Sequence, residues 1–230
     1  MNTKRWIALV SAAVLLFFSL GLNTIMSLFK TDFFSSFESA FDVTESTVYE
    51  TPIENGAMDN RIALVSVEGT ILDVGSGSWW EEVQYNHQGF MAQLDSILND
   101  DTVKGVVLEV NSPGGGVIES AEIHEKLVQI KEQREIPIYV SMGTYAASGG
   151  YYIAAPADKI FAQKETITGS IGVIMQAINY EELAEKVGIK FETIKSGQHK
   201  DMLGGSRAST EEEKAMLQEI IDESYEDFVD

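Results

Sequence analysis

Two glycine-rich segments carry residue types that suit acyl-transfer chemistry. The first, 112–117 (SPGGGV), joins an expected strand to an expected helix, and the second, 141–152 (SMGTYAASGGYY), places Ser148 between an alanine and a glycine. Glycines let backbone N–H groups approach a ligand closely, and a helix start adds positive potential. Such loops can hold a phosphate or an oxyanion. Neither loop has a dinucleotide or P-loop pattern, which disfavours phosphate. A plain tight turn at 112–117 and small-residue helix packing at 141–152 stay open as alternatives.

Ser148 has the surroundings that an attacking serine needs. It lies where a strand is expected to turn into a helix, and its small neighbours leave room for a substrate, as in a nucleophile elbow, although GxSxG is not matched. Such a serine also needs a base. The segment 196–201 (SGQHKD) offers Lys200, or His199 with Asp201, so a Ser–Lys dyad and a Ser–His–Asp triad both stay open.

A lysine acts as a base only when its amine is neutral. Its pKa must then fall from about 10.4 toward 7, a change that burial can supply. Met202 and Leu203 follow Lys200 and are apolar enough to contribute to burial, whereas a solvated loop lysine is the plainer alternative. In a third segment, 166–173, the Ser170 hydroxyl is able to orient a neutral lysine amine, with simple turn chemistry as the alternative.

Composition excludes several classes of function. Sixteen basic residues face 36 acidic ones, a net charge of −20, which argues against nucleic acid and anionic lipid as main partners. The chain has no cysteine, and therefore no thiol nucleophile or cysteine metal site. Its three histidines lack HExxH-type spacing, so we expect neither a metal nor a cofactor.

The N-terminal region predicts a membrane anchor. Residues 1–5 include Lys4 and Arg5, and the 24 residues 6–29 carry no charge. A membrane-spanning helix needs about 20 apolar residues, and this stretch is long for a cleaved signal peptide, so a retained anchor is favoured. The basic residues place the N-terminus in the cytoplasm and the rest outside the cell membrane.

The remaining chain is expected to form one globular domain after a linker. Residues 30–60 are rich in Ser, Thr, Asp and Glu and read as a linker or stalk, and the domain spans 61–230. The chain ends inside a helical pattern, so we expect this domain to be truncated at its C-terminal end. Hydrophobic periodicity predicts strands at 62–68, 103–110, 136–141, 159–162 and 190–194, and helices at 87–98, 119–133, 147–154, 180–187 and 210–229. This alternation predicts an α/β fold with a largely parallel sheet covered on both faces.

Taken in order, the motifs resemble peptidase family S49, the signal peptide peptidases of the Clp-protease/crotonase superfamily. The matching segments are 111–117 (NSPGGGV), 141–152 (SMGTYAASGGYY), 168–173 (TGSIGV) and 196–201 (SGQHKD). The likeness covers roughly 61–230 together with the anchor, and the position of the lysine after the serine fits the short Gram-positive form. It implies a fold of repeated ββα units with a parallel sheet.

The resemblance also implies roles for individual residues. Ser148 would be the nucleophile, Lys200 the general base and Ser170 the residue that orients the lysine, with the N–H groups of Gly115 and Gly149 forming the oxyanion hole. The implied substrates are signal-peptide remnants and other unfolded apolar peptides, cut by a membrane-bound homo-oligomeric ring whose neighbouring subunits often complete the pocket. Two alternatives stay open: a crotonase-type acyl-CoA enzyme, and a non-catalytic membrane scaffold.

Overall fold

The computed structural model describes residues 16–18, 48–57, 59–73 and 85–230. The chain separates into two units, Met1–Thr47 and Val48–Asp230, and the account below concerns the second. Of the expected anchor, only residues 16–18 are described, and they are helical. Within the described residues, no helix combines the length and apolar character that a membrane crossing requires. The rest of the 6–29 stretch and most of the linker lie outside the described residues.

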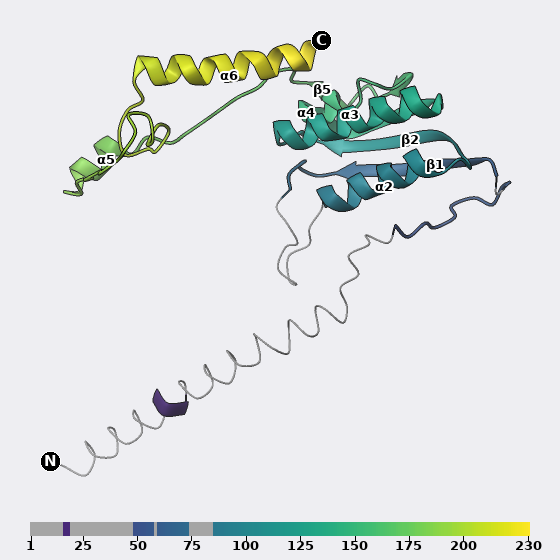
Figure 1. Ribbon diagram of the computed structural model, residues 1–230, viewed down its shortest axis with the longest axis horizontal. Helices are drawn as coiled ribbons and strands as arrows, with labels where there is room; N and C mark the ends of the chain where they lie inside the picture. The colour runs from purple at the N-terminus through teal and green to yellow at the C-terminus, as the bar shows by residue number, and fades with distance from the viewer. Residues whose placement is uncertain (1–15, 19–47, 58, 74–84) are drawn as a thin grey trace. The chain divides into compact units, whose positions relative to one another are not determined.

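The second unit contains a parallel sheet with helices beside it (Figure 1). Its strands are β1 (Arg61–Glu68), β2 (Val103–Ser112), β3 (Ile138–Ala147), β4 (Lys159–Phe161) and β5 (Ile167–Gly169). The order is β1-β2-β3-β4, and β5 pairs with the end of β3 beyond β4. All of these pairings are parallel. The expected α/β class with a parallel sheet is therefore confirmed.

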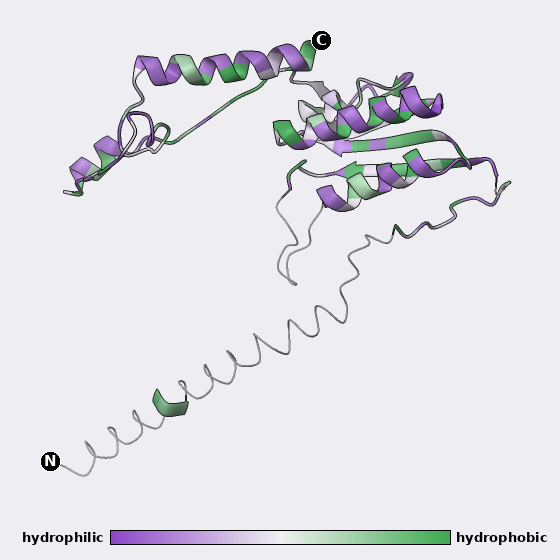
Figure 2. Cartoon of the chain, viewed as in Figure 1, coloured by the Kyte–Doolittle hydropathy of each residue, from purple (hydrophilic) through white to green (hydrophobic). Residues whose placement is uncertain are grey.

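Two amphipathic helices supply the crossover connections that parallel strands need. Helix α2 (His87–Asn99) joins β1 to β2, and α3 (Val117–Arg134) joins β2 to β3; the two helices pack beside each other. Their buried side chains pack with inward-facing strand residues into one core: Phe90, Leu94, Ile97, Ile123, Leu127, Ile130, Val65, Val67, Val106, Leu108, Val110, Ile138 and Val140. In Figure 2 the strands β1 and β2 are mostly hydrophobic, whereas α3 alternates between hydrophobic and hydrophilic residues.

The expectation of a sheet covered on both faces is wrong for the described residues. Burial alternates along β1 and along the first half of β3, so that Val65 and Val67 are buried whereas Ile62 and Leu64 are exposed. Because side chains of a strand point alternately to opposite faces, this pattern marks one covered face and one open face.

Three further elements differ from the expected ones. Strand β3 was expected to end at residue 141 but runs to Ala147, because its second half pairs with β5, a strand that was not expected from the sequence. The expected strand 190–194 is absent: the segment contains aromatic and β-branched residues, but it is exposed and pairs with no strand of the described residues. Helix α4 (Gly149–Tyr152) is a single turn rather than the eight residues expected.

The C-terminal part contains α5 (Glu181–Lys186) and the long α6 (Glu211–Val229). The expected capping start of α6 is confirmed: the Thr210 hydroxyl accepts a hydrogen bond from the Glu213 amide, and the Glu213 carboxylate accepts one from the Thr210 amide. This reciprocal pair satisfies two amides that the first helical turn would otherwise leave unpaired.

Candidate active site

Ser148 occupies the sharp turn between β3 and α4 in a strained conformation. Its φ is 52° and its ψ is −124°, a combination that non-glycine residues rarely adopt. Its amide donates to the Gly169 carbonyl at 2.8 Å, and its carbonyl accepts from the Tyr151 and Tyr152 amides at 2.8 and 3.0 Å. Strain of this kind persists where surrounding structure enforces it, which is common at functional sites. The turn leaves the Ser148 side chain half-buried.

Close backbone packing brings the two glycine-rich loops together. A Cβ atom on Gly114, whose φ is +96°, would lie 2.7 Å from the Gly149 nitrogen. A Cβ on Gly150 would lie 2.6 Å from the Ser112 carbonyl oxygen. Only glycine permits these approaches, so the glycines fix the loop of 112–117 against the serine turn. The sequence placed both loops at carboxyl ends of strands, and the structure shows that these ends meet.

The amides of Gly115 and Gly149 have no acceptor among the described residues. Gly149 is the first residue of α4, and the first amides of a helix lack intrahelical partners. Gly115 is exposed, and the bridge to Ile71 uses the Gly116 amide and the Gly114 carbonyl instead. Two unengaged N–H groups on loops that flank a serine can stabilise a developing oxyanion.

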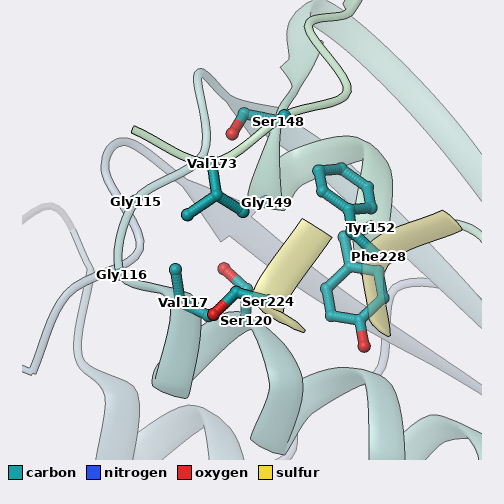
Figure 3. Close-up of a pocket in the computed structure, with 11 residues that line it drawn as sticks. Gly115, Gly116, Val117, Ser120, Ser148, Gly149, Tyr152, Val173, Ser224 and Phe228 are labelled. Carbon is teal, nitrogen blue, oxygen red and sulfur yellow. The ribbon is translucent and has the colours of Figure 1, made fainter. Parts of the chain in front are cut away.

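A small cavity of about 30 Å³ adjoins Ser148. Figure 3 shows its lining, which comes from the two loops, from α3 and α4, from residues 172–173 and from the end of α6. Tyr152 contributes one wall, with its ring centroid 4.9 Å from that of Phe228. On its other side Tyr152 stacks on His124 at 4.4 Å. Burial lowers the pKa of His124, which favours its neutral form.

The structure does not bring Lys200 to Ser148. Lys200 is exposed, its amide donates to the Gly197 carbonyl at 3.3 Å, and it does not line the cavity. No hydrogen bond between described residues joins its amine to Ser148 or to Ser170. Ser170 is exposed, has a φ of 54°, and directly follows Gly169, the acceptor for the Ser148 amide. The roles of Lys200 and Ser170 therefore stay predictions.

The triad alternative loses its support, because His199 and Asp201 have other partners. The Asp201 carboxylate accepts from Arg207 at 2.6 and 3.1 Å, and these bonds, with one from Lys195, hold its pKa well below the usual range. His199 Nδ1 lies 3.4 Å from the buried Glu213 carboxylate. Both side chains belong to an ionic cluster at the start of α6 rather than to the serine turn.

Comparison with known proteins identifies the family. The peptidase family S49 model matches residues 130–230. A relative from Enterococcus faecium, named "Putative signal peptide peptidase SppA", is 44% identical over 241 residues, covering 100% of this chain and 67% of that protein. This chain belongs to peptidase family S49.

Other relatives match this chain over shorter stretches. Protease 4 of Haemophilus influenzae is 39% identical over 137 residues, covering 60% of this chain and 22% of that protein. The chain spans about two thirds of the Enterococcus protein and less than half of the next curated relatives. A solved structure, the 1510-N membrane-bound stomatin-specific protease, is similar with 21% identity and a TM-score of 0.39, covering 51% of this chain and 48% of that one. Family S49 consists of serine proteases. The described part of this chain has no group of three or more His, Asp or Glu side chains suited to a metal.

The sequence analysis did not identify the residues that form the walls of the cavity beside Ser148. Besides Tyr152, they are Val117, Ser120, Val173, Ser224 and Phe228. Val117 and Ser120 were detectable in principle, because they share the first helical turn after the glycine-rich loop and lie three positions apart on one face. Ser224 and Phe228 come from a distant helix, and nothing in their local pattern indicates which surface they meet.

Proposed function

We propose that the protein is a membrane-anchored serine endopeptidase that degrades cleaved signal peptides and other unfolded apolar peptides. The observation that carries the proposal is the strained Ser148 turn, with the unengaged amides of Gly115 and Gly149 beside it, in a chain of family S49. Ser148 is the nucleophile, and Lys200 is the general base that takes its proton.

The chemistry follows from this arrangement. The Ser148 hydroxyl attacks the scissile carbonyl while its proton passes to a neutral lysine amine, and the carbonyl oxygen becomes an oxyanion held by the two glycine amides. The lysine then gives the proton to the leaving amine, which departs and leaves an acyl-enzyme. Water, deprotonated by the same lysine, attacks the ester and restores Ser148.

A second copy of the chain is proposed to complete the dyad. Lys200 does not line the cavity beside its own Ser148, so a neighbouring subunit in a homo-oligomeric ring is the proposed donor of the base. Support comes from the segment that runs from the end of β4 to the Lys200 loop, which exposes many large apolar side chains. Monomeric soluble proteins rarely expose large apolar patches. These exposed residues are Phe161, Ile167, Ile171, Ile174, Ile178, Leu183, Val187, Ile189, Phe191 and Ile194.

The membrane anchor and the orientation are part of the proposal. Their support is the uncharged stretch 6–29, preceded by Lys4 and Arg5. In the proposed orientation, the peptidase domain lies on the outer side of the cell membrane, next to the bilayer in which cleaved signal peptides remain with their apolar cores. Such substrates are unfolded chains, which suits a site made of loops at one edge of a sheet.

A serine-directed acylating probe tests the proposed function. The full chain, purified in detergent, should be labelled at Ser148, and Ser148→Ala should lose the label. The chain should also cut apolar synthetic peptides and leave folded proteins intact. Lys200→Ala and Lys200→Arg should both abolish cleavage, because a guanidinium stays protonated and cannot accept the serine proton.

The two alternative functions give different results in the same experiment. A scaffold would show neither labelling nor cleavage, and an acyl-CoA enzyme would bind acyl-CoA without cutting peptides. An active Lys200→Arg variant would refute the dyad even if Ser148 is labelled.

A further inference from the structure

Among the described residues that line the cavity beside Ser148, one buried side-chain hydroxyl lacks a partner. The Ser120 hydroxyl is buried at the lining of the cavity, the residue is 2% exposed, and no described residue accepts from it or donates to it. Its oxygen packs against the backbone of the residue that follows the nucleophile, since a Cβ on Gly149 would lie 2.3 Å from it. Buried hydroxyls are almost always hydrogen-bonded in folded proteins, so an unpartnered one inside a substrate cavity points to a ligand.

The other cavity side chains do not compete for this hydroxyl. Val117, Val173, Tyr152 and Phe228 form mostly apolar walls. Ser224 also lines the cavity, but its hydroxyl donates to the Ile220 carbonyl at 2.9 Å within α6. Among the described lining residues, Ser120 is thus the one whose buried hydroxyl has no hydrogen-bond partner. The volume of about 30 Å³ admits the end of a short side chain and excludes an aromatic ring.

We propose that Ser120 is a specificity-determining residue that makes this peptidase prefer a small hydroxyl-bearing side chain, threonine or serine, at the residue that supplies the scissile carbonyl. This inference rests on the proposed function, because it assigns a substrate preference to the site in which Ser148 cuts peptides. Threonine fits both features of the cavity: its methyl group contacts the apolar walls, and its hydroxyl pairs with the Ser120 hydroxyl.

The physical reason is the difference between threonine and valine, which have nearly the same shape. Either side chain expels water from the cavity when it binds. Valine leaves the Ser120 hydroxyl without any partner, whereas threonine replaces the lost water, and a buried polar group left unpaired weakens binding strongly. The site would therefore select hydroxyl residues within substrates that are otherwise apolar.

Fluorogenic peptides with an aminocoumarin leaving group test the preference, because the residue before the coumarin must occupy this cavity. Two peptides that differ only in Thr or Val at that residue are compared with the full chain in detergent. The wild type should cleave the Thr peptide with about tenfold higher kcat/KM. Ser120→Ala should bring the ratio to one or below, and Ser120→Cys should give an intermediate ratio.

Ser224→Ala is the matched control, since it removes a cavity hydroxyl that already has a partner, and it should keep the Thr to Val ratio of the wild type. Circular dichroism shows whether each variant is folded. A wild type that cleaves the Val peptide as well as the Thr peptide, or a ratio that Ser120→Ala and Ser120→Cys leave unchanged, would overturn the proposal.

A binding measurement separates this proposal from the proposed function. The same two sequences, as fluorescent peptides, are titrated into Ser148→Ala, and anisotropy gives their dissociation constants. About tenfold tighter binding of the Thr peptide supports the role of Ser120 even if no peptide is cut. Equal binding contradicts it. Absence of cleavage and labelling in the wild type instead refutes the peptidase function alone.

Discussion

Gly115 has no space for a side chain, and this fact yields a test of the oxyanion hole. A Cβ atom there would lie 2.0 Å from the Ile71 carbonyl oxygen, so Gly115→Val must move the loop and redirect its amide. Loss of one oxyanion donor costs a factor of about 10² to 10³ in turnover. We expect a loss of this size in kcat for an apolar peptide.

Gly56→Val provides the control for this measurement, because a Cβ at Gly56 meets no atom within 4 Å. It should retain wild-type turnover, and thermal melting should show that both variants are folded. Near-normal kcat in Gly115→Val would remove the Gly115 amide from the site.

At the residue scale, the sequence indicated the candidate nucleophile and its surroundings but not the cavity. Ser148, Gly115 and Gly149 were recognisable because chemistry at a tight turn requires small residues and glycine, and such requirements are local. The structure adds two features that the local sequence does not determine: the positive φ of Ser148 and the buried Ser120 hydroxyl, which has no partner among the described residues. Both depend on contacts between segments far apart in the chain.

At the element scale, the start of α6 depends on a buried carboxylate. Glu213 is 1% exposed, accepts a hydrogen bond from Thr210, and pairs with Arg207 at 2.5 and 2.8 Å. The hydrogen bonds from Arg207 are the main cause that lowers the pKa of Glu213 from 4.5 to about 2. A carboxyl whose pKa is lower in the folded state stabilises the fold fully above 4.5, and this stabilisation is lost as pH falls through about 2.

Glu213→Gln tests this linkage, because glutamine can keep the cap but carries no charge. The variant should be less stable than the wild type at pH 6, and the difference in unfolding free energy should shrink as pH falls from 4.5 toward 2. Urea unfolding at several pH values gives this difference. Glu219→Gln, at an exposed position of the same helix without an ion pair to any described residue, should show none of it. A difference between wild type and Glu213→Gln that stays constant with pH would contradict the assignment.

The elements themselves were predictable where they are local and amphipathic. Helices α2, α3 and α6 and strands β1 and β2 agree with the hydrophobic pattern to within a few residues. The failures occur where a strand depends on a distant partner: β5 exists because the end of β3 pairs with it, and 190–194 has the pattern of a strand but no described partner. Backbone pairing across a sheet depends on tertiary structure, so the hydrophobic periodicity of a segment alone does not determine it.

At the scale of the whole molecule, the separation of Lys200 from the serine cavity predicts complementation between subunits. Ser148→Ala and Lys200→Ala should each be inactive alone. If a neighbouring subunit supplies the lysine, co-expressed chains assembled at random in equal amounts should recover about a quarter of wild-type activity, since half of the sites keep the serine and half of those receive an intact lysine.

Co-expression of Ser148→Ala with the double variant Ser148→Ala/Lys200→Ala is the control, and it should stay inactive because no subunit carries the nucleophile. Peptide cleavage per mole of purified oligomer is the measurement. An inactive mixture of the two single variants, with assembly shown by light scattering, would mean that each chain uses its own lysine.

The orientation across the membrane is testable because the chain contains no cysteine, so one introduced cysteine is a unique label. Thr3→Cys lies before the uncharged stretch, and Lys164→Cys replaces a side chain that is 89% exposed in the peptidase domain. If the basic residues keep the N-terminus in the cytoplasm, a membrane-impermeant maleimide should label Lys164→Cys in intact bacterial cells and Thr3→Cys only after permeabilisation. The wild type, without a thiol, gives the background. The opposite labelling pattern would put the domain in the cytoplasm, away from cleaved signal peptides on the outer side, and would refute the proposed substrate together with the orientation.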